Sequence, residues 1–360
     1  MKLTLDEVGN LDKDRLCYLD MRGKIAYSHG HIPDALCFDT EHFEESVEKI
    51  PRDRIYIVYC SIGEKSMNVA EKLRKKGYEA YSLEAGFAAW LRANVSENER
   101  YERQMILPEV GLEGQEKLKN ARVLVIGAGG LGSPAALYLA GAGIGTIGIA
   151  DADTVSLSNL HRQILHTMAE LGQNKSESAK TNLQKLNDSV RIVTYPYHIT
   201  PENIDEIISN YDFIIDGVDN FETKFLINDA CVIRKKPFCH AGILRFQGQI
   251  MTYVPGKGPC YRCIFEEIPE QGSIPNCSQA GIIGAVAGVI GSIQALEAIK
   301  YILSAGELLT AKMYVFDGLT LKSRIIKFPY PSESCRVCGP EKNIVDVRLN
   351  RKEYAPAGCQ

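Results

Sequence analysis

The chain has 360 residues, of which 45% are hydrophobic and 24% charged, and its formal net charge is −4. This length exceeds one compact core and predicts two domains. A nucleic-acid partner requires a clear excess of Lys and Arg, so the slightly acidic balance argues against one. The first ten residues are charged and amphipathic, which is unlike a signal peptide.

The longest apolar stretch, residues 281–293, is shorter than the ~18 residues that a membrane span needs. We therefore expect a buried core helix there and no membrane partner. The chain contains 11 cysteines, and four of them form two C-x-x-C pairs. Without a secretory signal, this favours metal and thiol chemistry in a cytoplasmic protein over a disulfide framework.

Residues 1–92 are expected to form the first domain. Apolar runs of strand length occupy 15–21 and 54–59, and 66–76 has helical spacing that ends at Gly77. Alternating strands and helices favour a parallel sheet covered by helices. The polar stretch 93–100 predicts a linker.

The second domain is expected over 101–340, with a C-terminal tail over 341–360. The runs 123–126, 146–150 and 212–216 are apolar on both faces, as in the interior of a parallel sheet. The sequence thus predicts two α/β domains.

A glycine-rich loop, G-A-G-G-L-G at 127–132, follows the first of these runs and precedes a small-residue helix over 135–142. Glycines let the backbone approach a phosphate, and a helix N-terminus presents N–H groups to it. Asp151 follows the next run, where a carboxylate can accept ribose hydroxyls. This pattern predicts nucleotide binding, but the fingerprint alone fits NAD as well.

The charged residues that follow favour ATP. Arg162 lies in S-N-L-H-R-Q, Lys175 precedes the amphipathic stretch 176–186, and Asp219 follows the third run. Hydride transfer does not need such groups, whereas ATP chemistry develops charge on the α-phosphate and the departing pyrophosphate. Asp219 suits a Mg²⁺ ligand.

Together, R-Y-E-R-Q at 100–104, the glycine loop, residues 151–163, Lys175 and D-N at 219–220 resemble the MoeB/ThiF family, relatives of the ubiquitin-activating enzymes. The resemblance covers 100–339. It implies a Rossmann-like adenylation domain that uses ATP and Mg²⁺ to activate the C-terminal Gly-Gly carboxylate of a ubiquitin-like protein. It also implies a homodimer in which Arg103 reaches the phosphates of the partner subunit. The implied nucleotide site comprises Gly127, Gly129, Gly130, Gly132, Asp151, Ser158, Asn159, Leu160, His161, Arg162, Lys175, Asp219 and Asn220.

Two C-x-x-C pairs, Cys260 with Cys263 and Cys335 with Cys338, predict a metal site. Four thiolates form a closed tetrahedral Zn²⁺ site, which is structural because no position remains for water. Arg262 and Arg336 lie inside the pairs and are expected to offset the negative charge of this centre.

Cys60 ends the run 55–59 and opens C-S-I-G-E-K-S before a predicted helix. A helix N-terminus and loop N–H groups stabilise a thiolate, although an inert core cysteine is the alternative. With L-D-M-R at 19–22, G-H-I-P-D-A at 30–35 and E-A-G-F-A-A-W at 84–90, this loop resembles a rhodanese domain. That resemblance implies a Cys60 persulfide, a structural ion pair between Asp20 and Arg22, and a packing role for His29 or His31.

Cys277 lies in a polar, Pro-containing segment, where the MoeB/ThiF resemblance places an acyl-accepting or disulfide-forming cysteine. A surface thiol is the alternative. The leading hypothesis is adenylation of a sulfur carrier followed by persulfide transfer to a thiocarboxylate, with a cysteine desulfurase as a candidate persulfide donor. Three alternatives remain: a conjugating enzyme that forms a Cys277 thioester, an NAD-dependent oxidoreductase, and a non-catalytic scaffold.

Overall fold

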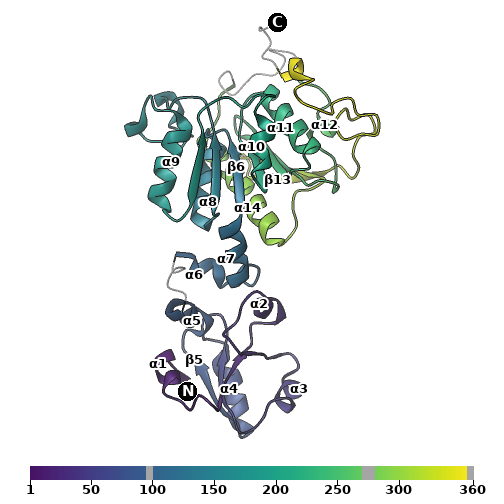
Figure 1. Ribbon diagram of the computed structural model, residues 1–360. Helices are drawn as coiled ribbons and strands as arrows, with labels where there is room; N and C mark the ends of the chain where they lie inside the picture. Colours follow the sequence, from purple (N-terminus) through teal and green to yellow (C-terminus); the bar gives the residue numbers. More distant parts are fainter. Residues whose placement is uncertain (95–99, 270–279, 355–360) are drawn as a thin grey trace. The chain divides into compact units, whose positions relative to one another are not determined.

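The computed structural model describes residues 1–94, 100–269 and 280–354 (Figure 1). Their contacts divide the chain into two compact units, Met1–Lys117 and Leu118–Gln360. Each unit combines a parallel or mixed sheet with helices, which confirms the predicted α/β class. The stretch expected to be a linker, 93–100, begins inside a helix that runs to Asn94.

The N-terminal unit is built on a five-stranded sheet with the order β1-β5-β4-β2-β3, and all its pairings are parallel. Strand β4 is buried along its whole length. Its alternate side chains enter two cores, with Ile57 and Tyr59 in one and Tyr56 and Val58 in the other. The strands are β1 (Lys2–Leu3), β2 (Leu16–Asp20), β3 (Leu36–Cys37), β4 (Ile55–Tyr59) and β5 (Glu79–Leu83).

Helices cover both faces of this sheet. Side chains of α3 and α4 close the core around Tyr56, and those of α1 and α5 close the core around Ile57. Helix α4 matches the helix predicted over 66–76. The helices are α1 (Leu5–Gly9), α2 (Lys24–Ser28), α3 (Phe43–Glu48), α4 (Ser66–Lys75) and α5 (Gly86–Asn94).

Two short elements beyond the linker, α6 (Glu102–Met105) and the first part of α7 (Gly111–Asn120), belong to the N-terminal unit. Tyr101 and Met105 are buried in the same core as Phe87 of α5. The sequence boundary at 101 therefore differs from the boundary in contacts, which lies after Lys117. Local pattern does not reveal this difference, because the apolar partners come from earlier helices.

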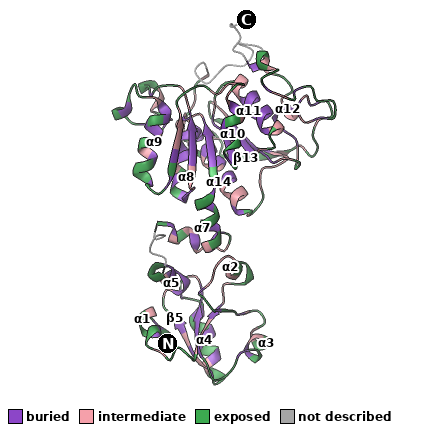
Figure 2. Cartoon of the chain, in the orientation of Figure 1, coloured by how far each residue is buried: buried purple, intermediate pink, exposed green. Residues whose placement is uncertain are grey.

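The C-terminal unit contains an eight-stranded sheet with the order β13-β12-β11-β10-β9-β6-β7-β8. Strands β6 to β10 pair in parallel, and β11 to β13 extend the sheet with antiparallel pairs. The predicted runs 123–126, 146–150 and 212–216 form β6, β7 and β9, and Figure 2 shows this central part of the sheet as buried. The strands are β6 (Arg122–Ile126), β7 (Thr146–Ala150), β8 (Arg191–Tyr195), β9 (Phe213–Asp216), β10 (Phe238–Leu244), β11 (Gln247–Tyr253), β12 (Lys312–Asp317) and β13 (Lys322–Lys327).

The order of these strands reverses at β6. The chain passes from β6 outward through β7 to β8 and then returns to β9 on the other side of β6. Ligands of open α/β sheets bind at such a reversal, beyond the carboxyl ends of the strands. The helices of this unit are α8 (Gly132–Ala142), α9 (Lys175–Leu186), α10 (Ile204–Ser209), α11 (Phe221–Ile233), α12 (Tyr261–Ile264) and α14 (Gly284–Leu303).

Helix α14 is longer than the apolar stretch 281–293 suggested, because it contains 20 residues and continues to Leu303. By length and composition alone it could cross a membrane, but 50% of its most apolar window is buried inside the unit. Two of its polar side chains are buried with partners. Gln294 donates to the Asp216 carbonyl at 2.7 Å, and Glu297 accepts from the Thr252 hydroxyl at 2.6 Å. These contacts fit the core helix that the sequence predicted.

The segment expected to be a tail packs onto the C-terminal unit as far as it is described. Ile344 and Val347 are buried in the main core of this unit. Tyr354, in the 3-10 helix Arg351–Tyr354, is buried there as well. Residues 341–354 therefore form part of the domain.

Candidate functional site

The glycine loop 127–132 turns from β6 into α8 through close backbone packing. A Cβ atom on Gly132 would lie 1.8 Å from the Gly127 carbonyl oxygen. Gly127 itself has φ +93°, and a Cβ there would lie 2.8 Å from the Gly217 carbonyl oxygen. Gly129 and Gly130 are only partly buried, so a phosphate can approach the N-terminus of α8 across them.

Two side chains hold this loop in place. Asp151, at the end of β7, accepts the Ala128 N–H through Oδ2 at 2.8 Å. His166, which the sequence analysis did not single out, lies with Nε2 2.9 Å from the Ala128 carbonyl oxygen, and its Nδ1 is 2.8 Å from the Ser178 hydroxyl. Nε2 must therefore carry a proton. Burial lowers the pKa of His166, which favours this neutral imidazole, and burial raises the pKa of Asp151.

The predicted residues 158–162 form one turn beside the glycine loop. Arg162 donates to the Asn159 side-chain oxygen at 3.1 Å, and its other terminal nitrogen lies 3.0 Å from His161 Nε2. Ser158 is exposed, and Leu160 caps the short 3-10 helix Leu157–Asn159. The Arg162 guanidinium is thus oriented by partners that are not carboxylates, which leaves its charge available to an anion.

Lys175 is the first residue of α9 and is 4% exposed. Its Nζ lies 2.9 Å from Oδ2 of Asp153, an exposed carboxylate. Because this partner faces solvent, a phosphate oxygen can compete with it for the ammonium group.

Asp219 and Asn220 are exposed and follow the carboxyl end of β9, where the strand order reverses. Asn220 is the N-cap of α11, and its side-chain oxygen accepts the Thr223 N–H at 2.9 Å. This contact gives Asn220 a structural function beside its predicted place in the nucleotide site. Asp219 remains free to face a cation.

A buried ionic group lies at the carboxyl end of β9, three residues before Asp219 in the chain. Oδ2 of Asp216 lies 3.3 Å from Lys224 Nζ and 2.7 Å from His240 Nδ1. Lys224 also donates to the Ala241 carbonyl at 2.8 Å. Burial alone would raise the pKa of Asp216, but Lys224 and His240 hold it below its usual value. The sequence analysis missed this group because its members lie far apart in the chain.

Gln163 carries an unsatisfied acceptor beside the glycine loop. The residue is 4% exposed, and within the described part of the chain its Oε1 has no hydrogen-bond partner. Buried polar atoms are nearly always paired, so an orphaned oxygen here fits a site whose ligand supplies the donor.

The four predicted cysteine ligands lie together. Their sulfur atoms are all within 4.8 Å of one another, and four of the separations are 3.8, 3.6, 3.3 and 3.6 Å. A tetrahedral zinc ion with bonds of about 2.3 Å requires sulfur atoms about 3.8 Å apart. The donor set therefore fits Zn²⁺ and joins the segments at Cys260, Cys263, Cys335 and Cys338.

Both arginines inside these pairs form salt bridges with carboxylates. Arg262 is buried and forms a salt bridge with Asp229 at 2.8 Å. Glu353 lies 3.2 Å from Arg262 and 2.5 Å from Arg336, so it links the two C-x-x-C segments. The acids come from α11 and from the segment predicted as a tail, and spacing alone could not identify them.

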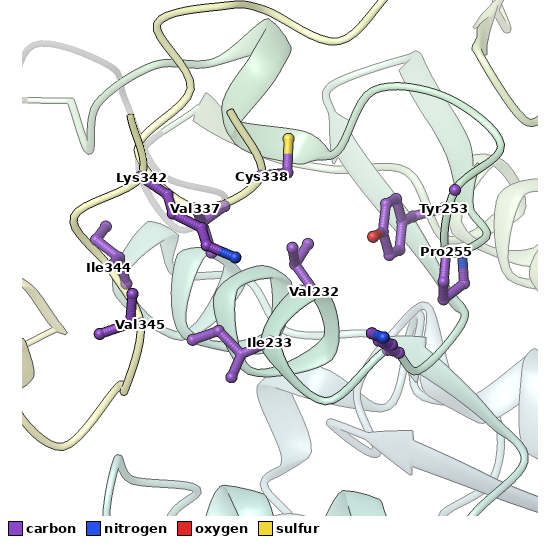
Figure 3. A pocket seen from close by; sticks show the side chains of 11 residues that line it. Val232, Ile233, Tyr253, Pro255, Val337, Cys338, Lys342, Ile344 and Val345 are labelled. Atoms are coloured by element: carbon purple, nitrogen blue, oxygen red, sulfur yellow. The ribbon is translucent and has the colours of Figure 1, made fainter. Parts of the chain in front are cut away.

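A hollow of about 460 Å³ lies beside the cysteine cluster (Figure 3). Cys338, Val337, Ile344 and Val232 line it together with Lys342. It lies among segments remote in sequence from the glycine loop and contains none of the predicted nucleotide-site residues.

The purified protein should contain about one zinc ion per chain, because four thiolates at these separations leave no open ligand position. Elemental analysis of Cys335→Ala should show loss of the metal. Cys231→Ala, which alters a buried thiol outside the cluster, should retain it. Fresh wild-type protein without zinc would contradict the assignment.

Cys60 lies between β4 and α4, in a loop that curls around its sulfur atom. The Gly63 N–H lies 3.2 Å from Cys60 Sγ, and the Ser66 hydroxyl lies 3.7 Å from it. Burial raises the pKa of Cys60, but hydrogen bonds from Ser66, Ile62 and Lys65 outweigh burial and lower it overall. This is the thiolate environment that the sequence predicted.

The predicted ion pair of the N-terminal unit is confirmed as structural. Arg22 lies 2.6 Å from Asp20, both side chains are buried, and Tyr59 donates to Asp20 at 2.8 Å. His31 stacks on Tyr27 with ring centres 3.9 Å apart, which matches its expected packing role.

Alkylation by iodoacetamide should follow different pH curves at two thiols of this unit. The alkylation rate rises with the thiolate fraction, so a lowered pKa moves the midpoint for Cys60 to lower pH. Burial and nearby Asp20 raise the pKa of Cys37, whose midpoint should lie higher. Ser66→Ala removes one hydrogen-bond donor and should shift the alkylation midpoint of Cys60 toward that of Cys37. Peptide mass mapping that finds Cys60 titrating at or above Cys37 would refute this.

Two further residues of the predicted sites are Arg103 and Cys277. Arg103 lies on α6 and is exposed. Cys277 lies outside the described residues.

The folds and sites define a two-domain protein that joins a nucleotide-binding α/β unit with a cysteine cluster to a parallel-sheet unit with a stabilised thiolate. Residues 101–337 match the ThiF family, and residues 4–93 match the rhodanese-like domain. The chain belongs to the ThiF family.

Curated relatives and solved structures agree with this placement. The chain is 46% identical over 256 residues to the adenylyltransferase and sulfurtransferase MOCS3 of Aedes aegypti, a match that covers 71% of this chain and 59% of that protein. A Dictyostelium discoideum protein of the same name is 44% identical over 253 residues, covering 70% and 60%. The chain thus spans about three fifths of the length of these relatives. The crystal structure of E. coli MccB with ATP is 27% identical with a TM-score of 0.59, covering 69% of this chain and 79% of that one.

Proposed function

We propose that this protein adenylates the C-terminal Gly-Gly carboxylate of a ubiquitin-like sulfur carrier and then converts it to a thiocarboxylate. The observation that carries the proposal is the presence, in one chain, of a phosphate-type glycine loop with Arg162 and Lys175 and of a Cys60 thiolate loop. The names of the curated relatives, adenylyltransferase and sulfurtransferase, pair the same two activities.

ATP is the nucleotide that this site fits best. The crystal structure of E. coli MccB with ATP is similar to this chain over 69% of its length. The glycine loop can bind phosphate, and the Asp151 carboxylate can accept ribose hydroxyls. The unpaired Gln163 oxygen can accept a further hydrogen bond from the ligand. Asp219 would hold Mg²⁺, which would neutralise charge on the phosphates.

The first step needs no general base. The carrier carboxylate is already ionised, so one of its oxygens can attack the α-phosphorus while pyrophosphate departs. Arg162 and Lys175 then stabilise the added negative charge. Asp153 holds the Lys175 ammonium group in a salt bridge until phosphate oxygens replace the carboxylate.

Sulfur transfer follows from the acyl-adenylate. The outer sulfur of a Cys60 persulfide attacks the acyl carbon, the bond to oxygen breaks, and AMP leaves with the electron pair. Cys277 then attacks Cys60 Sγ of the acyl disulfide, which releases the thiocarboxylate and leaves a Cys60–Cys277 disulfide. An external dithiol reduces that disulfide and becomes a disulfide itself, and a cysteine desulfurase resupplies the persulfide sulfur.

We infer a homodimer and a cytoplasmic location from two further features. Helices α8 and α14 expose Tyr138, Val289 and Leu296, which are 61%, 41% and 51% exposed, and large exposed apolar side chains favour burial in an interface. None of the nine cysteines of the described residues forms a disulfide, which fits a reducing compartment.

Asp219→Ala should lower carrier-dependent exchange of pyrophosphate into ATP by at least about 100-fold, because it removes the proposed Mg²⁺ ligand. Asp212→Ala is the matched control, since this exposed carboxylate lies at the opposite end of β9. Radiolabelled exchange at the wild-type rate in folded Asp219→Ala would exclude the assigned role.

Cys60→Ala and Cys277→Ala should both retain pyrophosphate exchange, since adenylation uses neither thiol. Cys60→Ala should form no thiocarboxylate, whereas Cys277→Ala should slow product release or trap an adduct. Intact-mass spectrometry of the carrier detects the product as a gain of about 16 mass units for the exchange of oxygen for sulfur.

The same measurement tests the conjugation alternative. A Cys60→Ala enzyme that still yields the thiocarboxylate would contradict the role of Cys60. A wild-type enzyme that forms only a Cys277 thioester would instead establish an activating enzyme for conjugation.

A further inference from the structure

His240 is a buried histidine to which the proposed reaction assigns no role. It lies on β10 in register with Asp216, the last residue of β9, and is 1% exposed. Its ring contacts the Tyr261 ring, with the two ring centres 4.2 Å apart. Because the side chain is enclosed, His240 can influence a bound nucleotide only through its neighbours in the fold.

The imidazole carries its single proton on Nδ1. Burial alone would raise the pKa of Asp216, but Lys224 and His240 lower it, so the carboxylate is ionised. Burial and the nearby Lys224 lower the pKa of His240, so the ring is neutral. Nδ1 lies 2.7 Å from Asp216 Oδ2, whereas Nε2 has no hydrogen-bond partner within the described residues. His240 thus donates one hydrogen bond, and it donates it to an ionised carboxylate.

Asp216 connects this hydrogen bond to the turn that precedes Asp219. Its second carboxylate oxygen, Oδ1, accepts the Val218 N–H at 3.2 Å. Gly217, between them, packs directly on the glycine loop, because a Cβ there would lie 3.0 Å from the Gly127 carbonyl oxygen. The turn 217–219 is therefore held between the Asp216 carboxylate and the loop at which phosphate is expected to bind.

Lys224 does not by itself fix the direction of this carboxylate. Its Nζ lies 3.4 and 3.3 Å from the two oxygens of Asp216, so the ammonium group favours neither of them. His240 contacts Oδ2 alone, at a shorter distance and from a ring packed against Tyr261. This directional bond occupies Oδ2 and leaves Oδ1 facing the Val218 N–H.

We propose that His240 is a positioning residue for the nucleotide site, which holds the turn 217–219 against the glycine loop through Asp216 and thereby sets the affinity for ATP with Mg²⁺. This inference rests on the proposed function, in which the glycine loop binds phosphate and Asp219 faces the cation. Without the Nδ1 donor, the Asp216 carboxylate can rotate and the turn loosens. Nucleotide binding must then order the turn, which lowers the affinity.

Three variants separate this role from a general effect on the fold. His240→Leu removes the donor, whereas His240→Asn keeps an amide N–H at the position of Nδ1. Thr252→Val is the matched control, because it removes a different buried hydrogen bond, the 2.6 Å contact with Glu297, from the neighbouring strand β11. All three are compared by their melting temperatures before binding is measured.

Calorimetric titration with ATP and Mg²⁺, without carrier, measures the affinity. His240→Leu should bind about tenfold more weakly, since it loses a hydrogen bond to a charged group. His240→Asn and Thr252→Val should stay within about twofold of the wild-type affinity. Hydrogen exchange at the Val218 N–H, followed by NMR without nucleotide, should become faster in His240→Leu and in neither of the others.

Wild-type affinity in folded His240→Leu would overturn the proposal, and so would an equal loss in His240→Asn or in Thr252→Val. If His240→Leu does not fold, His240→Gln takes its place with the same expected loss, because its amide lies one bond further from the backbone than Nδ1. The wild-type protein tests the proposed function separately. ATP binding without carrier-dependent pyrophosphate exchange would remove the proposed reaction and leave the role of His240 in binding intact.

Discussion

The C-terminal unit depends on the contact of three glycines at the carboxyl ends of β6 and β9. Gly132 approaches Gly127 so closely that a Cβ would lie 1.8 Å from the carbonyl oxygen, and a Cβ on Gly217 would lie 3.0 Å from the same atom. Backbone therefore packs directly on backbone at the place where the strand order reverses. At Gly127 and Gly132 only glycine permits this contact, because a side chain there would separate the turn, the start of α8 and the end of β9.

The remaining parts of the nucleotide site are positioned by that contact. β9 ends against the glycine loop, so Asp219 follows close to this loop in the chain. The pairing of β6 with β7 brings Asp151 within hydrogen-bond distance of the Ala128 N–H. Removing charges from water is costly, so the buried Asp216 requires Lys224 and His240 as partners. This ionic group fixes the end of β9 against β10 and so supports the exposed residues above it.

Much of this architecture could be predicted from local sequence, and the features that could not be predicted share one cause. The apolar runs, the glycine loop and the cysteine spacing are local patterns, and the strands and the thiolate loop appear where those patterns place them. The docking of Met105 on α5, the link from Glu353 to Arg336 and the pairing of Lys175 with Asp153 join distant segments. No periodicity or motif encodes such contacts, so neither the contact boundary after Lys117 nor the packed C-terminal segment could be predicted.

The two candidate sites stabilise negative charge by different means, and the difference suits their chemistry. Arg162 and Lys175 bring full positive charges, which phosphates and a departing pyrophosphate need. The Cys60 sulfur instead accepts hydrogen bonds from loop N–H groups and the Ser66 hydroxyl. Dipoles favour the thiolate without pairing it with a fixed cation, so the sulfur keeps its nucleophilicity for an acyl carbon. Binding of phosphate and transfer of sulfur can therefore be tuned independently.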